Sequence, residues 1–297
     1  MARSSARRIF YDLRPSKQSE RRIMMDVLRA AGESGLPMAN YRYVGMGAVR
    51  FYDFLLVHRY LGINQMVSLE HDHGMFLRAQ FNRPYEFIDV RNQTTSAFIS
   101  ADPFDLPTII WFDYDGGLGP HIAEDVSSAG VKLKQGDFFF VTVNGHPPRA
   151  IDRQRTADRL VWLQDTLGDL SGDVRLSDVE DSSFAIAVHK VLLAAFKNAF
   201  ASRRDGSFKV VLQVEYTDTS NIVTVGGAFL PDGLAITFVE RLTKQLPFLG
   251  RGDDTLYEIV ALPITEQERA LFDRAATKRG RSAERNAFSN GSRAAAR

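Results

Sequence analysis

The sequence predicts an α/β fold: a doubly wound, mostly parallel seven-stranded sheet with a C-terminal antiparallel hairpin and helices on both faces. Two observations support this class. From Tyr41 onward, five short runs rich in β-branched and aromatic residues alternate with runs of helical periodicity, which is the pattern of parallel strands joined by helices. Nearer the C-terminus, two strand-like runs are separated only by the turn-forming letters TDTSN, which favour an antiparallel hairpin.

A helix is expected before the sheet. Apolar residues recur at helical spacing from Ile23 to Ala31, and Gly32 and Gly35 end the pattern. The strands that follow are almost continuous in apolar residues, as in parallel sheets that are covered on both faces. Strands are expected at 41–46, 65–70, 85–90, 108–114 and 137–143, and helices between them at 48–61, 73–82, 94–101 and 119–134.

The second half departs from this alternation. Residues 146–207 contain two helical runs separated by a polar stretch, so a helical insert is expected there. The hairpin strands follow at 208–218 and 221–230. The predicted organisation is a basic leader with an N-terminal helix (1–40), a Rossmann-like main domain (41–235) that contains the insert, a C-terminal extension packed on it (236–277) and a basic flexible tail (278–297).

Charge is unevenly distributed along the chain. The net charge is +1, but residues 1–22 and 278–297 each carry +5, which leaves −9 for the residues between them. Basic ends are typical of solvated flexible tails, and they would also suit contacts with nucleic acid or an acidic protein. The absence of cysteine excludes disulfides, thiolate metal sites and a cysteine nucleophile. Without a membrane-spanning stretch or a signal core, the expected location is cytoplasmic.

Chemistry is expected at the carboxyl ends of the parallel strands, where ligands bind in open α/β sheets. The first strand ends in Gly45-Met46-Gly47, and glycines in such a turn let the backbone approach a ligand closely. A helix beginning near Ala48 would direct free N–H groups at the same ligand. Glu70 ends the second strand, and its carboxylate suits the two hydroxyls of a ribose. The alternatives are a plain strand-to-helix turn and a solvated loop carboxylate.

Further candidates lie in the third strand, at the ends of the fourth and fifth strands, and before the first helix. Asp89 could accept a hydrogen bond from an exocyclic adenine amine, or could serve as a capping residue. Asp113 and Asp115 follow the apolar run TIIWF and would face the reacting group. The candidate substrate-binding residues are Arg14, Lys17, Tyr114 and Asn144, of which the two cations could hold an anionic group and Asn144 could instead form a turn.

With these glycines and acids in this order, the chain resembles the class I S-adenosylmethionine-dependent methyltransferases over about residues 41–230. The resemblance implies a methyltransferase that binds S-adenosyl-L-methionine and whose methyl acceptor is not identified. The size of the helical insert suggests a macromolecular acceptor. The resemblance implies that Gly45, Met46 and Gly47 bind the methionine part of the cofactor, Glu70 its ribose and Asp89 its adenine. It also implies that Asp113 lies beside the cofactor and that Asp113 or Asp115 positions or deprotonates the acceptor.

Two positions depart from the family pattern. Tyr43 stands where the family has an acid before the glycine loop, and Val49 stands where it has a third glycine. A second hypothesis is therefore a catalytically degenerate Rossmann-like subunit that binds a nucleotide or nucleic acid. NAD-dependent redox chemistry ranks behind both, because a fuller glycine loop would need glycine at Arg50. His71 and His73 could hold a divalent ion for O-methylation, but the histidines form no metal motif and no metal is expected.

Overall fold

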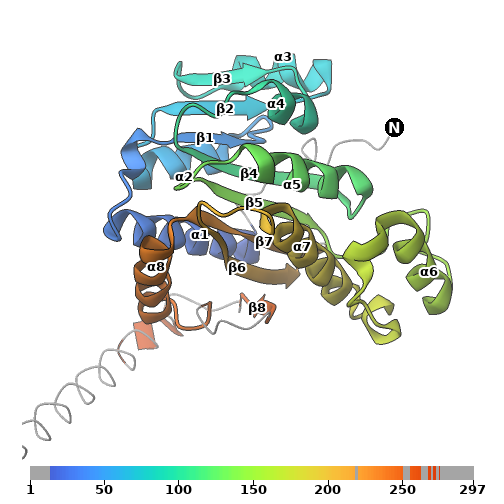
Figure 1. Cartoon of the computed structure of the whole chain (residues 1–297). Helices are drawn as coiled ribbons and strands as arrows, with labels where there is room; N and C mark the ends of the chain where they lie inside the picture. The colour runs from blue at the N-terminus through green and yellow to red at the C-terminus, as the bar shows by residue number, and fades with distance from the viewer. Residues whose placement is uncertain are drawn as a thin grey trace, which may run out of the picture. The chain divides into compact units, whose positions relative to one another are not determined.

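One mixed sheet lies at the centre of the part of the chain that the structure describes. The computed structural model describes residues 14–217, 220–249, 255–261, 267–268, 270–271 and 274. Within these residues, eight strands form a single sheet in the order β3-β2-β1-β4-β5-β7-β6-β8 (Figure 1). The strands are β1 (Arg42–Gly45), β2 (Gln65–Leu69), β3 (Ile88–Arg91), β4 (Thr108–Gly117), β5 (Phe138–Asn144), β6 (Ser207–Thr217), β7 (Asn221–Leu230) and β8 (Tyr257–Ile259).

Strand direction follows the predicted pattern. Strands β1 to β5 pair in parallel, whereas β7 runs antiparallel to both β5 and β6. The predicted α/β class with a C-terminal antiparallel part is therefore confirmed. The sheet has eight strands rather than seven, because a short segment of the predicted C-terminal extension adds β8 in parallel beside β6, with Ile259 opposite Tyr216.

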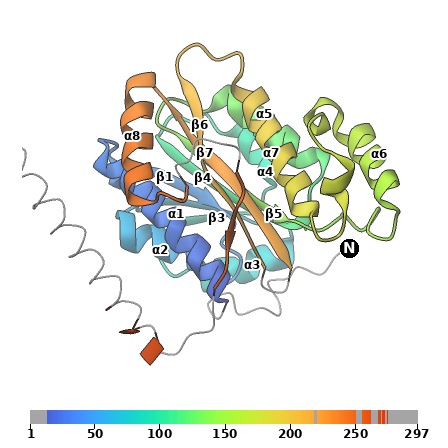
Figure 2. The ribbon, with the colours of Figure 1, turned by 90° about the horizontal axis from the view of Figure 1, so that it is seen from below.

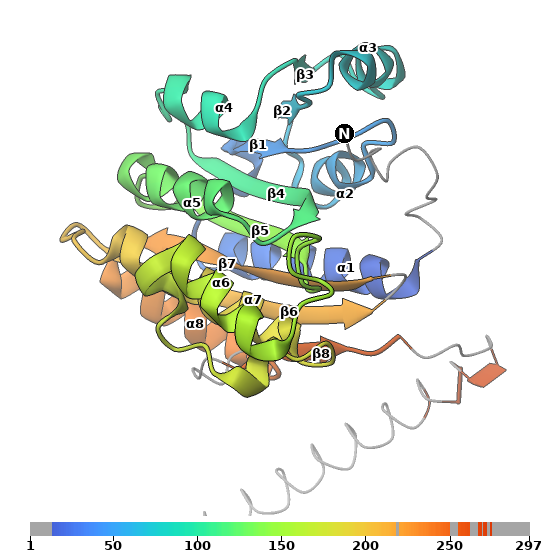
Figure 3. The same cartoon turned by 90° about the vertical axis from the view of Figure 1, so that its right-hand side faces the viewer.

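Helices cover both faces of this sheet (Figures 2 and 3). One core is formed by the sheet with α1, α2, α3 and α8, and buries Met24 and Phe54 completely. The other is formed with α4, α5, α6 and α7, and buries Ile122 and Val188 completely. The helices are α1 (Pro15–Glu33), α2 (Tyr52–Leu61), α3 (His73–Asn82), α4 (Thr95–Ala101), α5 (Pro120–Lys132), α6 (Thr156–Leu167), α7 (Phe184–Phe200) and α8 (Asp232–Gln245).

Helix α2 begins later than the sequence predicts. The periodicity places its start near Ala48, but the helix begins at Tyr52. Ala48 and Phe51 adopt left-handed backbone conformations, with φ of 45° and 53°, and residues 48–50 form a turn. Such conformations are uncommon for residues with a Cβ. The segment that follows Gly47 is therefore an irregular turn and not the first turn of a helix.

The third strand also starts later than predicted, at Ile88 rather than Tyr85. Tyr85 and Phe87 stack on each other with ring centroids 4.9 Å apart, and both rings contact His58 of α2. These aromatic contacts hold the segment as a turn that precedes β3.

The predicted domain boundaries stay predictions. The leader up to residue 13 and the basic tail (278–297) lie outside the described residues. Among the helices of the described part, none is both long and apolar enough to cross a membrane.

Candidate functional site

The glycine loop leaves the carboxyl end of β1, which lies between β2 and β4 in the sheet. The Gly47 amide donates to Ser68 Oγ of β2 over 3.1 Å, and the Phe51 amide donates to the Gly47 carbonyl over 2.8 Å. A Cβ on residue 47 would lie only 2.5 Å from the Phe51 ring and 2.9 Å from Ser68 Oγ. Close packing alone therefore requires glycine here, and the loop has little room to move.

Glu70 and Asp115 lie at the carboxyl ends of the two strands that flank this loop, Glu70 just after β2 and Asp115 in the last part of β4. Glu70 directly follows β2 and is half-buried, and its Oε1 accepts a hydrogen bond from the Asp72 amide over 3.1 Å. Burial raises the pKa of Glu70 against the opposing hydrogen bond from the Asp72 amide, and the negative charges of Asp72 and, to a smaller extent, of Asp115 at the exposed end of β4 raise it further. Glu70 thus lies in a region of negative charge at the carboxyl edge of the sheet.

Asp89 is placed differently from the other predicted acids. It lies inside β3 rather than at its end, its side chain is exposed, and its Oδ2 accepts from Arg91 Nε over 2.7 Å. The polar residue that follows β3 is Asn92, which the sequence reasoning missed. Asn92 Nδ2 donates to the carbonyl oxygens of Glu70 and His71 over 2.8 and 3.1 Å, so it ties the ends of β2 and β3 together.

Asp113 is brought together with Lys17, one of the predicted cations. Its Oδ2 lies 2.8 Å from Lys17 Nζ and 3.3 Å from Arg21 Nη2. Burial alone would raise the pKa of Asp113, but the two cations outweigh burial and hold that pKa below its usual range. Asp113 is therefore a firmly ionised carboxylate, which makes it a weak proton acceptor.

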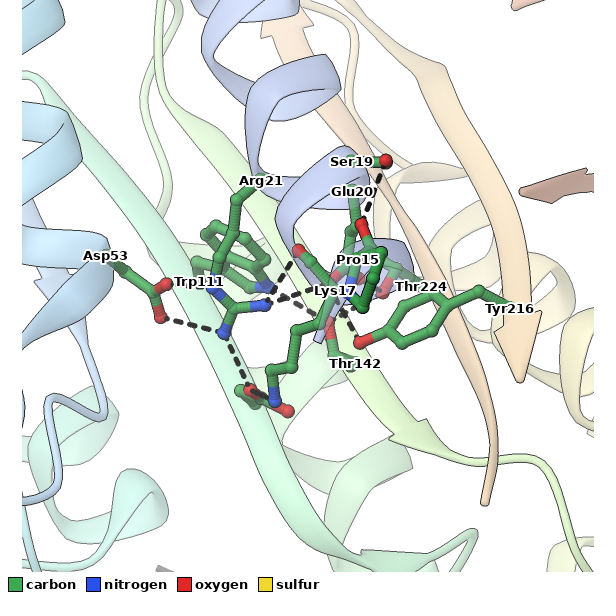
Figure 4. Close-up of polar contacts among 11 residues, drawn as sticks. Pro15, Lys17, Ser19, Glu20, Arg21, Asp53, Trp111, Thr142, Tyr216 and Thr224 are labelled. Atoms are coloured by element: carbon green, nitrogen blue, oxygen red, sulfur yellow. Dashed lines mark hydrogen bonds and ion pairs between the residues drawn. The ribbon is translucent and has the colours of Figure 1, made fainter. Parts of the chain in front are cut away.

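A buried polar network surrounds this contact on the face of the sheet that α1 covers (Figure 4). Glu20 of α1 is fully buried and accepts hydrogen bonds from Thr224 Oγ1 and, over 3.0 Å, from Tyr216 Oη. Burial raises the pKa of Glu20 above its ordinary value, because the opposing effect of the neighbouring Arg21 charge offsets burial only in part. The Trp111 indole donates to Thr142 Oγ1, which pairs with Thr224 Oγ1. Figure 4 shows these side chains converging from α1 and from neighbouring strands.

Sequence reasoning missed Glu20 and Arg21. Both stand in the run SERR of the first helix, where charged residues usually face solvent. The one sequence feature that points to them is their position in the same helix as Lys17, which is itself a candidate binding residue.

The remaining candidates have local partners. Tyr114 Oη donates to the buried Asp125 of α5 over 2.6 Å, and burial raises the pKa of Tyr114 well above its usual range. Asn144 Oδ1 accepts from the His146 amide over 2.9 Å, which is a turn contact. Arg14 directly precedes α1, and its carbonyl accepts from the Gln18 amide. Tyr114 is thus held by α5, on the face of the sheet opposite to α1.

Among the described residues, no group of three or more His, Asp or Glu side chains is arranged to hold a metal ion. His73 Nδ1 lies 3.1 Å from Asn92 Oδ1, and His71 Nδ1 lies 3.7 Å from Glu70 Oε1. Both predicted histidines therefore contact neighbours at the ends of β2 and β3.

The doubly wound sheet with its terminal antiparallel pair is the fold that the resemblance to Rossmann-like methyltransferases implies, and such sheets bind ligands at the carboxyl edge, where the glycine loop and the carboxylates lie. A family model described as "Putative O-methyltransferase" matches residues 9–295. The chain belongs to this family, and its resemblance to methyltransferases is confirmed.

Several solved structures are similar to the chain. One is the N-methyltransferase NodS from Bradyrhizobium japonicum WM9, with 13% identity over 75% of this chain and 100% of that chain and a TM-score of 0.40. Another is precorrin-6y C5,15-methyltransferase from Geobacter metallireducens GS-15, with 10% identity over 71% of this chain and 87% of that chain and a TM-score of 0.38. No curated protein matches the chain.

Proposed function

We propose that the protein transfers a methyl group from S-adenosyl-L-methionine to an oxygen atom of its acceptor, in the cytoplasm. One observation carries this proposal: Glu70 and Asp115 stand on the strands either side of the glycine loop, at the carboxyl edge of the sheet, in a chain of an O-methyltransferase family. This is the edge at which open α/β sheets bind ligands.

The residues at this edge suit the cofactor chemically. A half-buried carboxylate at Glu70 can accept hydrogen bonds from ribose hydroxyls, and partial burial strengthens such bonds. Gly45, Met46 and Gly47 would border the methionine part, and the Gly47 amide and carbonyl, which are bonded to Ser68 and Phe51, would fix the shape of the loop. Asp89, exposed on β3, would accept from the adenine amine.

The two acids of β4 have different proposed roles. S-adenosyl-L-methionine supplies an electrophilic methyl group on a positively charged sulfur. Asp113 stays ionised beside Lys17, so it would contribute negative charge near the bound cation and not accept a proton. Asp115, exposed at the end of β4, would orient the acceptor hydroxyl and take its proton.

The acceptor side of the site is proposed from the chain that follows β5. The insert between β5 and β6 carries α6 and α7 and would form one wall of the acceptor site, with Asn144 at its entrance. The remaining substrate-binding candidates are Arg14, Lys17 and Tyr114. The basic termini would attach a nucleic acid or an acidic protein by charge.

Calorimetry with S-adenosylhomocysteine tests the proposal. The wild-type protein is expected to give saturable binding, and Glu70→Gln is expected to bind about tenfold to hundredfold more weakly, because a hydrogen bond to a charged group contributes about 1.5–3 kcal/mol. Glu86→Gln, a change of the same kind at an exposed turn residue, should leave the dissociation constant unchanged. Absence of heat with wild type rejects the proposed function, whereas equal affinity in Glu70→Gln rejects only the assignment of the ribose.

A further inference from the structure

Arg21 of α1 joins the elements on both sides of the glycine loop. Its Nε and Nη2 both donate to the Asp53 carboxylate, at 3.2 Å for Nη2, and Nη2 also lies 3.3 Å from Asp113 Oδ2. Asp53 is in the first turn of α2, which follows the loop and the turn after it, and Asp113 lies in β4 two residues beyond Trp111, the residue that pairs with Gly45. One buried side chain therefore connects α2, which follows the loop in the chain, to β4, which pairs with β1 beside the loop.

We propose that Arg21 is a positioning residue for the cofactor loop, a role that rests on the proposed function. By binding Asp53 and Asp113 together, it sets the distance between the start of α2 and the part of β4 that lies beside the end of β1, and so fixes the loop that both elements flank. Helix α1, which precedes the sheet in the chain, then contributes to the cofactor site by positioning its loop.

The geometry of the guanidinium supports this role. Arg21 is 3% exposed, its Nη1 donates to Glu20 Oε2 over 3.1 Å and to the Lys17 carbonyl over 3.5 Å, and its Cζ lies 5.2 Å from the centroid of the Trp111 ring. All three nitrogens are engaged at once, which uses the planar fork of arginine. An ammonium carries the same charge but has neither the fork nor the stacking plane.

A continuous set of contacts connects Asp53 to the loop. Asp53 follows Phe51 by two residues, and the Phe51 amide donates to the Gly47 carbonyl. The Phe51 ring packs so closely on Gly47 that no side chain fits there, and Phe51 also contacts Phe54 at 5.5 Å between ring centroids. A shift of Asp53 would therefore displace Phe51 and, with it, Gly47.

Arg21→Lys tests this role because it keeps the positive charge and removes the fork. Arg29→Gln is the matched control: Arg29 is on the same helix, is 58% exposed at its side chain and, among the described residues, forms surface ion pairs with Asp26 and Glu33. Two readouts are needed: hydrogen exchange of residues 45–57 without ligand, and the dissociation constant of S-adenosylhomocysteine by calorimetry at a temperature where every variant is folded by circular dichroism.

Arg21→Lys is expected to speed exchange in residues 45–57 and to weaken S-adenosylhomocysteine binding about tenfold, while Arg29→Gln matches wild type in both. The double variant Arg21→Lys/Asp53→Asn should bind no more weakly than Arg21→Lys, because both changes break the same contact. A purely structural Arg21 would lower the melting temperature and speed exchange across the whole fold rather than selectively in residues 45–57, so exchange without that selectivity together with unchanged affinity in Arg21→Lys overturns the proposal. If wild type fails to bind, the proposed function falls, and the exchange data alone decide whether Arg21 orders the loop.

Discussion

Replacing Gly47 by alanine is expected to weaken binding of S-adenosylhomocysteine by about a hundredfold. The added Cβ would lie 2.5 Å from the Phe51 ring and 2.9 Å from Ser68 Oγ, so the loop has to move. Overpacking of this kind costs about 1–3 kcal/mol, and the upper part of that range corresponds to about a hundredfold in affinity when the displaced atoms form the binding site. Calorimetry at a temperature where the variant is folded measures the effect.

Gly116→Ala is the control for this prediction. Gly116 belongs to the same edge of the sheet, near the end of β4, but a Cβ there meets no atom within 4 Å. The variant should bind as wild type does. Equal affinity in Gly47→Ala and wild type would show that the cofactor does not depend on the position of this loop.

Replacing Asp113 by asparagine is expected to lower the free energy of unfolding by about 2–3 kcal/mol at pH 7. The change leaves the Lys17 ammonium, which is almost fully buried, without its carboxylate. Removing one partner of a buried ion pair costs about 3–5 kcal/mol, and the partial exposure of Asp113, 23% of its side chain, reduces that cost. Urea denaturation measures the difference, and Asp89→Asn, which breaks an exposed pair with Arg91, should cost less than about 1 kcal/mol.

The pH dependence gives this prediction a second test. The pKa of Asp113 is held below its usual range by Lys17 and Arg21 against the opposing effect of burial, so its ionised form stabilises the folded state. That stabilisation is complete above the ordinary aspartate pKa of about 4 and is lost as the pH falls through the folded-state value. The difference in unfolding free energy between wild type and Asp113→Asn should therefore be constant near neutral pH and shrink below about pH 4. A difference that grows on acidification would contradict the assigned ion pairs.

Much of the fold follows from local sequence patterns. Strand β7 has the predicted bounds and α3 spans the predicted residues, because each element has one clear periodicity and turn-forming residues beside it. The start of α2 could not be predicted, since the left-handed conformations fall on Ala48 and Phe51, residue types that give no sign of a positive φ. Strand β8 is three residues long and has one buried residue, Ile259, which is too short a pattern to detect.

The site was only partly predictable, because its residues meet across long stretches of chain. Lys17 and Asp113 were both singled out, but their 96-residue separation gives no indication that they pair with each other. Glu20 and Thr224 are separated by 204 residues, and a buried glutamate on a helix of mixed polarity has no local signature. The sequence predicts that the residues at the carboxyl ends of the strands lie near one another. It does not predict which of them pair with residues of α1, because those pairs depend on how α1 packs on the sheet.

A crystal structure of the protein with S-adenosylhomocysteine tests the central claim most directly. We expect the homocysteine part against the backbone of Gly45–Gly47 and the ribose hydroxyls within hydrogen-bond distance of the Glu70 carboxylate. Adenosyl density at another edge of the sheet, or a ribose without contact to Glu70, would contradict the account.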